Sequence, residues 1–246
     1  MKNDPEKKLL IIIRHGERTD RVGEIPKCGI LNPELTQKGK IQSFLASKIL
    51  IQTIFKHGIK DISPNIIQIR TSPYIRTIQT AVQILKGFNT FFKEQNLINE
   101  NLNNIYIDFD LRKRIKPNKK INKNEFLYKT IEHYIDFDQE LKDFNYLGDK
   151  GEFSLEPETK EQCEKRSFNY TENILRNNIE KNSDKKIFII IGHRGCLKYI
   201  LKKLGYDNII KNKKILDYCS QFFFDITKGI DNATFLENIS KPNNLE

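Results

Sequence analysis

The sequence of 246 residues contains no tryptophan and a single methionine, and its hydrophobic runs are short. The longest strongly apolar runs are residues 9–13 and 187–191, far below the ~20 residues that a membrane-spanning helix needs. The first run is interrupted by Arg14, so the amino-terminal stretch lacks the hydrophobic centre of a secretory signal. We therefore expect a soluble protein with no membrane partner, located in the cytoplasm, with the nucleus as the alternative.

Paired cysteine motifs are also absent. The chain has four cysteines, Cys28, Cys163, Cys196 and Cys219, and none belongs to a CxxC pair. This scatter is typical neither of a disulfide framework nor of a zinc site. We expect reduced thiols, no metal and no cofactor.

Acidic residues are outnumbered by basic ones, 32 to 42, which gives a formal net charge of +10. Such an excess suits a nucleic acid, an anionic membrane or a phosphorylated substrate, and the sign alone does not choose among them. The most basic stretch, residues 112–123, has weak periodicity and few aromatic residues, so it is interpreted as a solvated loop. Nucleic-acid binding is therefore the least favoured of the functions considered.

Short apolar runs alternate with helical patterns along the chain. Strands are predicted at residues 8–13, 65–70, 105–109, 186–191 and 218–226. Helices are predicted after Thr36 as N-cap, after Ser72-Pro73 as N-cap and first turn, and at residues 126–134, 157–180 and 196–204. The last dozen residues are expected to be a frayed tail.

This alternation predicts an α/β fold in which helices cover both faces of a mainly parallel sheet, a three-layer α/β/α sandwich. We expect one domain over residues 1–246, with an insertion at about residues 111–157. The insertion is predicted to fold over the site as a lid, and a solvent-facing loop is the alternative. In such sheets the ligand site lies beyond the carboxyl ends of the strands.

Two histidines occupy equivalent positions at those strand ends. His15 and His193 each follow a buried-strand pattern, and Arg14, Arg18 and Arg76 are placed to converge on the same point. Arginines bind phosphate oxygens in a two-pronged way and stabilise the charge that develops during phosphoryl transfer. His15 is therefore the candidate nucleophile, which would form a phosphohistidine, and His193 a candidate hydrogen-bond donor to the phosphoryl group. Gly16 is expected to let the backbone approach the ligand closely.

Four ordered motifs resemble the signature of the histidine phosphatase superfamily, the phosphoglycerate-mutase-like proteins. They are Arg14-His15-Gly16, Leu35-Thr36 with Gly39 (LTxxG), residues 72–81 (SPYIRTIQTA) and Gly192-His193. The resemblance implies a phosphoglycerate mutase-like fold and a metal-independent phosphomonoester hydrolase that works through phospho-His15, with Arg14, Arg18, Arg76 and His193 binding the phosphate. Related phosphatases often dimerise, so a homodimer is left open.

Within the superfamily, residues 14–20 (RHGERTD) and 158–174 are most similar to the group that includes the suppressors of T-cell receptor signalling. That group uses a second arginine, which Arg18 matches. Phosphoglycerate mutases carry a small polar residue at that position and an RHYG segment that this sequence lacks. The resemblance therefore implies a phosphatase and disfavours a mutase.

One departure concerns the general acid. The family places a glutamate after the third strand in an L-x-E context, and this chain has Leu111-Arg112-Lys113 instead. A lysine cannot act as the same acid at neutral pH unless its pKa falls a long way. The replacement candidates are Asp108, Asp110, Glu125 and Glu152, each of which is more simply interpreted as a surface carboxylate. The acid-phosphatase arrangement, an aspartate after the second histidine, is excluded because Arg194 follows His193.

Two functions from different classes follow. The first is a phosphatase that favours aryl phosphates such as phosphotyrosine, because aryl groups leave with little protonation. The second is a pseudophosphatase that retains the phosphate site but has lost efficient turnover. The substrate, a small molecule or a phosphoprotein, is not identified by the sequence.

Overall fold

The structure is a computed structural model that describes residues 6–97, 101–117, 130–149, 151, 156–182, 184–207 and 216–239. Its centre is a 7-stranded sheet in the order β4-β3-β2-β5-β1-β6-β7. The strands are β1 (Leu9–Arg14), β2 (Ile67–Thr71), β3 (Asn104–Ile107), β4 (Asn145–Gly148), β5 (Ile187–Gly192), β6 (Gln221–Asp225) and β7 (Thr234–Ile239). The first five in the sheet order are mutually parallel, whereas β6 runs antiparallel to both β1 and β7.

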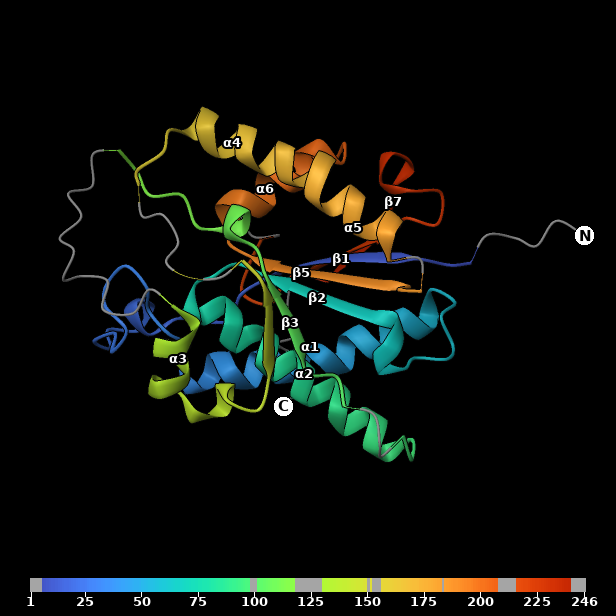
Figure 1. The fold of residues 1–246 in the computed structure, drawn as a ribbon, viewed down its shortest axis with the longest axis horizontal. Helices are drawn as coiled ribbons and strands as arrows, with labels where there is room; N and C mark the ends of the chain where they lie inside the picture. Colours follow the sequence, from blue (N-terminus) through green and yellow to red (C-terminus); the bar gives the residue numbers. More distant parts are fainter. Residues whose placement is uncertain are drawn as a thin grey trace, which may run out of the picture.

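Helices cover both faces of this sheet, which confirms the predicted α/β/α layering (Figure 1). The helices are α1 (Gln37–Lys56), α2 (Ile75–Glu94), α3 (Ile131–Phe137), α4 (Lys160–Asn169), α5 (Arg176–Lys181) and α6 (Arg194–Lys203). Helices α1 and α2 lie on one face, while α4, α5 and α6 lie on the other (Figure 1). A π-helical segment, η6 (Tyr170–Leu175), joins α4 to α5, so the predicted helix at 157–180 is present with an irregular middle.

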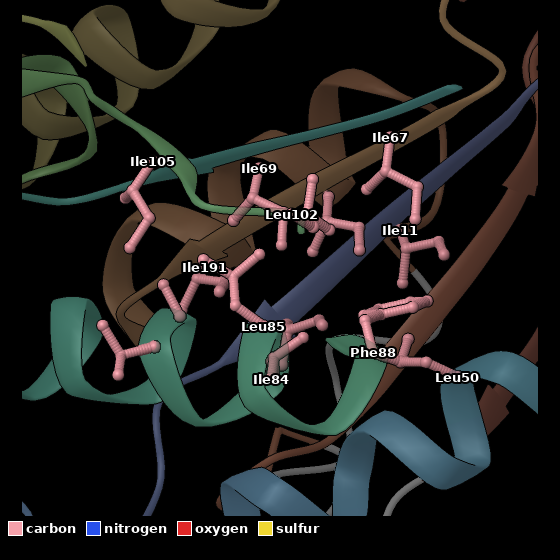
Figure 2. Packing of buried hydrophobic residues seen from close by; sticks show 14 of the residues in the cluster. Ile11, Leu50, Ile67, Ile69, Ile84, Leu85, Phe88, Leu102, Ile105 and Ile191 are labelled. Carbon is pink, nitrogen blue, oxygen red and sulfur yellow. The ribbon is translucent and has the colours of Figure 1, made fainter. Parts of the chain in front are cut away.

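Two hydrophobic cores lie on opposite faces of the sheet, because successive side chains of the central strands point to opposite faces. On β1, Leu9, Ile11 and Ile13 belong to the core beneath α1 and α2, whereas Leu10 and Ile12 belong to the core beneath α6. Figure 2 shows Leu85 and Phe88 of α2 packed toward the strands in the first core. Because both faces of β1 and β5 are covered, these strands are continuous apolar runs, as parallel central strands typically are.

Several predicted boundaries were wrong. Helix α2 begins at Ile75 with Tyr74 as N-cap, so Ser72 is not the cap. Helix α6 begins at Arg194, two residues earlier than predicted. Thr36 is confirmed as the N-cap of α1, since its side chain accepts a hydrogen bond from the backbone N–H of Gly39.

Two strands were missed. The predicted tail contains most of β7, whose Phe235 packs against Phe224 of β6 with ring centroids 5.6 Å apart, and this contact offsets the cost of ordering the segment. Within residues 111–157, β4 adds to the sheet edge beside β3. The helix predicted at 126–134 appears as α3 at 131–137, and residues 126–129 lie outside the described part of the chain. Among the helices described, none combines the length and the apolarity needed to cross a membrane.

Candidate active site

The register of the central strands brings the two histidines together. Arg14 pairs with Gly192 in the parallel β1–β5 ladder, and the next N–H, that of His15, donates to the Gly192 carbonyl at 3.2 Å. On the other side of β5, the backbone N–H of Ser72 donates to the Ile191 carbonyl, also at 3.2 Å. The carboxyl ends of β1, β5 and β2 therefore lie at one level, and the residues that follow them share one site.

Two glycines let the loop after β1 pack on the start of α1. A Cβ on Gly16 would lie 2.6 Å from the Gly39 carbonyl oxygen, and a Cβ on Gly39 would lie 2.2 Å from the Glu17 carbonyl oxygen. The close neighbour of Gly16 is thus the Gly39 backbone, and the expectation that Gly16 lets the backbone approach a ligand stays a prediction. The glycines of the first two motifs are a packing pair.

The third motif ties this loop to α2. Gln79 accepts a hydrogen bond from the Leu35 N–H at 2.8 Å, and the Thr80 hydroxyl accepts one from the Gly16 N–H at 3.1 Å. Both side chains are buried. They satisfy backbone groups that would otherwise be desolvated without a partner, so the first three motifs form one structural unit.

His15 is held as a neutral base. Its ring is 3% exposed, and Nδ1 lies 2.8 Å from the Gly16 carbonyl oxygen, which can only accept a hydrogen bond. Nδ1 therefore carries the proton, which leaves the lone pair on Nε2. Burial, followed by the charges of Arg76 and Arg14, lowers the pKa of His15 well below its usual value. The imidazole is consequently unprotonated at neutral pH and has the tautomer that a nucleophile at Nε2 requires.

His193 is held in the opposite tautomer. A guanidinium N–H of Arg76 donates to its Nδ1 at 3.2 Å, so the proton is on Nε2, which donates to the Ser72 hydroxyl at 2.8 Å. The two imidazole centroids lie 5.4 Å apart. Burial is the main cause of a pKa of His193 well below its usual value. Sequence reasoning missed Ser72 as a partner of His193, and this bond also explains why Ser72 does not cap α2.

Arg76 lies at the buried end of the site. It is 0% exposed, its guanidinium lies 4.5 Å from the centroid of the Tyr74 ring, and its Nε and Nη1 have no hydrogen-bond partner among the described residues. Burial lowers its pKa to about 9, so it remains charged at neutral pH. A buried guanidinium with unsatisfied N–H groups is costly unless an anion joins it, which marks this end as an anion site.

Arg14 and Arg18 complete the predicted cluster. Arg14 donates to the Leu216 carbonyl at 2.6 Å and lies over the Tyr218 ring, and Arg18 pairs with Asp20 at 2.7 Å. The Nε of each is buried without a partner in the described part of the chain. The structure thus brings all five predicted residues together, with Arg76 behind His193 and the other four facing a common pocket.

That pocket has a volume of about 260 Å³. It is smaller than the ~300–1,000 Å³ of typical small-molecule sites, so it suits a small ligand or the end of a larger one. The residues that line it are Arg14, His15, Arg18, Arg21, Lys113, Arg114, His193, Arg194 and Gly195. Sequence reasoning did not assign Arg21, Arg114 or Arg194 to the pocket, because they lie in irregular segments or beyond the motif residues.

None of the described carboxylates lines this pocket, and Lys113 does. Asp108, a candidate acid, is excluded from that role because it is buried in an ion pair with Arg70 at 2.6 Å and accepts a hydrogen bond from the Tyr170 hydroxyl. Asp110 is half-buried with a pKa raised mainly by burial, but its carboxylate faces Arg112, not the pocket. Glu125 and Glu152 lie outside the described residues.

Residues 10–108 match the model of a known family, the histidine phosphatase superfamily, branch 1. The matched stretch contains the first three motifs, with Arg14, His15, Arg18 and Arg76. Over residues 10–108 the chain is therefore similar to the histidine phosphatase superfamily. His193 lies outside the matched stretch, but the β1–β5 pairing brings it to the same site as His15. No curated protein matches this chain significantly in sequence.

Solved structures share the fold of this chain over nearly its whole length. The ecdysone phosphate phosphatase of Bombyx mori, solved with tungstate, is 18% identical, covers 97% of this chain and 95% of its own, and has a TM-score of 0.61. The phosphoserine phosphatase of Entamoeba histolytica, solved with 3-phosphoglyceric acid, is 16% identical, covers 95% and 98%, and has a TM-score of 0.54. A mycobacterial glucosyl-3-phosphoglycerate phosphatase is 15% identical, covers 93% and 96%, and has a TM-score of 0.51.

Proposed function

We propose that the protein hydrolyses phosphomonoesters through a covalent phosphohistidine on His15. The observation that carries this proposal is the pairing of a neutral His15, whose Nε2 has a free lone pair, with the buried guanidinium of Arg76, whose Nε and Nη1 lack partners among the described residues. The first supplies a nucleophile and the second an electrostatic complement to phosphate. The match of residues 10–108 to the histidine phosphatase superfamily supports the same reaction.

In the first step, Nε2 of His15 forms a bond to phosphorus while the ester P–O bond breaks, and the electron pair leaves with the ester oxygen. In the second step, water attacks phosphorus, the P–N bond breaks, and its electron pair returns to Nε2. Because Nδ1 already donates to the Gly16 carbonyl, the positive charge that develops on the ring during attack is stabilised by that bond.

The arginines act on the phosphoryl oxygens. Arg14, Arg18 and Arg76 neutralise the charge of the bound phosphate and of the transition state. In this proposal Arg76 turns from His193 to the phosphate, which frees Nδ1 of His193. A nearby dianion also favours protonation of that ring, so that His193 can donate to a phosphoryl oxygen as the sequence predicts.

The leaving group determines which esters react. Without an acid, an alkoxide must depart unprotonated, whereas an aryloxide departs with little help. We therefore infer a preference for aryl phosphates, including phosphotyrosine. Arg18 supports the finer assignment to the group of the suppressors of T-cell receptor signalling. That assignment, the cytoplasmic location and a homodimer stay predictions.

The test is hydrolysis of para-nitrophenyl phosphate in the presence of EDTA, because nitrophenolate leaves without an acid. Wild-type protein should release nitrophenolate and phosphate, and His15→Ala should not. His133→Ala is the matched control, since His133 is an exposed histidine on α3, and it should keep wild-type activity. Activity that survives in His15→Ala would refute the role of His15.

The pseudophosphatase is the second candidate, and a specific observation favours it: Lys113 lines the pocket where the family places its acid. Calorimetry with orthovanadate distinguishes the two functions. Binding of vanadate without hydrolysis of para-nitrophenyl phosphate would support a phosphate-binding module, whereas binding together with hydrolysis would exclude it.

A further inference from the structure

The amino-terminal end of α2 carries Arg76, yet its cap comes from a distant part of the chain. The N-cap residue, Tyr74, makes no capping hydrogen bond with its side chain. The first backbone N–H of the helix, that of Ile75, donates instead to Oδ1 of Asn32 at 3.2 Å. A buried helix end needs such a partner, because its first N–H groups have no acceptor within the helix. Asn32 therefore caps α2 from a position 43 residues earlier.

Asn32 is held in one orientation. It lies in the loop that follows η1 (Thr19–Arg21), it is 0% exposed, and its backbone N–H donates to the Gly29 carbonyl at 3.0 Å. Its Nδ2 donates to the hydroxyl oxygen of Tyr134 at 2.7 Å. An amide side chain has a donor end and an acceptor end, so the contact with Tyr134 keeps Oδ1 facing Ile75. In the reversed orientation, two donors would face each other at the end of α2.

Tyr134 connects this cap to the predicted insertion, residues 111–157. It is a buried residue of α3, and it belongs to the same hydrophobic core as Ile75 and Ile78 of α2. Figure 1 places α3 beside the amino-terminal part of α2. A second contact joins the two helices, because Asp138, the C-cap residue of α3, accepts a hydrogen bond from Gln79 at 2.7 Å. The start of α2 is thus tied to α3 at two points.

Arg76 depends on this arrangement because its own polar contacts are few. It is the second residue of α2, directly after the capped Ile75. One guanidinium nitrogen donates to Nδ1 of His193, and Nε and Nη1 have no hydrogen-bond partner among the described residues. The place of the guanidinium is therefore determined mainly by the backbone of the first turn. A misplacement of about 1 Å in such a group can cost about two factors of ten in rate.

We propose that Asn32 and Tyr134 are positioning residues for Arg76. Tyr134 orients the Asn32 amide, Asn32 fixes the first turn of α2, and that turn directs the Arg76 guanidinium toward the phosphoryl group. The inference rests on the proposed function, because it uses the phosphate-binding role of Arg76. It gives the insertion a part in the reaction that does not require it to close over the pocket as a lid.

The test is a double-mutant cycle that joins Tyr134 to Arg76, with kcat/KM for para-nitrophenyl phosphate measured in the presence of EDTA. Tyr134→Phe removes the hydroxyl and keeps the ring in the core, and it should lower kcat/KM by about tenfold, as indirect partners of functional groups do. In the Arg76→Met background the same change should have almost no effect, because its path to the phosphate is already gone. An equal loss in both backgrounds, or no loss in the wild-type background, would overturn the inference.

Tyr146→Phe is the matched control. Tyr146 lies on β4 within the same insertion, and its hydroxyl donates to the Leu141 carbonyl at 2.8 Å, so this change also removes a hydrogen-bonded hydroxyl. It should leave kcat/KM unchanged. A loss as large as that of Tyr134→Phe would show that any disturbance of the insertion lowers activity, and the specific role of Tyr134 would be refuted.

Asn32→Asp provides a second variant that tests the orienting role. A carboxylate can accept the Ile75 N–H with either oxygen, so it needs no partner to orient it, and an acidic side chain is a favourable cap. Introduced into Tyr134→Phe, this change should restore most of the lost kcat/KM. Folded protein in which activity is not restored would contradict the orienting role of the Tyr134 hydroxyl.

Vanadate binding separates this inference from the proposed function. If wild-type protein hydrolyses para-nitrophenyl phosphate and Tyr134→Phe has the wild-type rate, the inference fails and the proposed function stands. If wild-type protein does not hydrolyse the ester, the proposed function fails, and calorimetry with orthovanadate replaces the rates in the same cycle. Tyr134→Phe should then weaken vanadate binding when Arg76 is present and not in Arg76→Met. Any other pattern of affinities would overturn the inference.

Discussion

Two regions of the pocket are built by different kinds of backbone. The floor consists of Arg14, His15 and His193, with Arg76 behind His193, and the rim consists of Arg21, Lys113, Arg114 and Arg194. Arg14, His15 and His193 stand at the ends of buried parallel strands, and Arg76 stands in the first turn of a buried helix. The rim residues Lys113 and Arg114 stand instead on a segment without regular structure, held by side-chain contacts from α4. The floor is fixed by the sheet register itself, whereas the rim depends on a few polar contacts and can vary without altering the fold.

This difference separates reaction from selectivity. In the proposed function, the floor supplies the nucleophile and the phosphate-binding groups that any phosphoryl substrate would use. In the same proposal, the rim would contact whatever is attached to the transferred phosphate. Substitutions in the floor should therefore affect all substrates alike, whereas substitutions in the rim should change their ranking.

The largest effect expected within the floor, after loss of His15, is that of Arg76→Met. Removing this guanidinium should lower kcat/KM for every phosphate ester by about 10²- to 10³-fold, as for other transition-state donors. The variant should unfold at the same or a higher urea concentration than the wild type, because it removes a buried charge whose Nε and Nη1 have no described partner. Initial rates measure the change in kcat/KM, and urea titrations of the same preparation measure the change in stability.

Arg176→Met serves as the comparison variant, since the Arg176 side chain is partly exposed, pairs with Asp231 and does not line the pocket. It should change neither rate nor stability much. A loss of activity in Arg76→Met that is accompanied by an equal loss of stability would mean that Arg76 is structural and would remove it from the floor.

The second expected effect is a dependence of the free energy of unfolding on pH. His15 and His193 both have pKa values lowered by burial, so below about pH 6.5 the unfolded chain binds protons that the folded chain does not. The free energy of unfolding should be constant above that pH and should decrease as the pH falls below it, by at most about 1.4 kcal/mol per pH unit for each histidine. Urea titrations between pH 5 and 8 measure the slope.

Replacing His15 by Asn should reduce that slope, whereas His133→Asn should not, because His133 is exposed. An unchanged slope in His15→Asn would show that His15 is already solvated in the folded state. It would then also lack the lowered pKa on which its neutral form depends.

A smaller effect is expected for Ser72→Ala. Ser72 is a positioning residue, because its hydroxyl accepts the Nε2 proton of His193 at 2.8 Å. Its loss should lower kcat by about tenfold and leave KM nearly constant, since indirect partners of a functional histidine typically contribute this much. Ser72→Thr, which keeps the hydroxyl, should restore most of the rate. Equal losses in both variants would indicate a packing defect.

The smallest effect is expected at the rim for simple monoesters. Arg21→Gln should raise KM for para-nitrophenyl phosphate by only a fewfold and leave kcat unchanged, because this ester has no second anionic group to contact the rim. The effect should shrink further as the salt concentration rises. Rates at several ionic strengths measure this. A large fall in kcat would place Arg21 in the floor and would erase the distinction between the two regions.

The sequence predicted the floor well because its signals are local and physically strong. A run of five apolar residues ends two positions before each of His15 and His193, and such runs are typical of buried strands. Parallel pairing of the two strands then places both histidines at one edge of the sheet. The hydrogen bond from His193 to Ser72 was missed, because it joins residues 121 positions apart and replaces a helix-cap role that the local pattern favours. The roles of Gly16 and Gly39 were likewise hidden, since their contact is a tertiary one.

The rim and the sheet edges could not be predicted in the same way. Arg21 and Arg114 carry no motif, and their place in the pocket depends on η1 and on the hydrogen bonds of Arg166. Strand β4 has half-buried and exposed positions only, so its sequence shows no apolar run, and β7 is similar. These edge strands are stabilised by pairing with a sheet that already exists.

The most direct test of the central claim is to trap the covalent intermediate. Protein mixed with ³²P-labelled para-nitrophenyl phosphate and quenched in alkali within milliseconds should carry label that is stable to base and lost in acid, as a phosphohistidine is. Mass spectrometry of the digested protein should locate the phosphoryl group on His15, and His15→Ala should carry none. Label on another residue, or turnover with no trapped label and full activity in His15→Ala, would contradict the account.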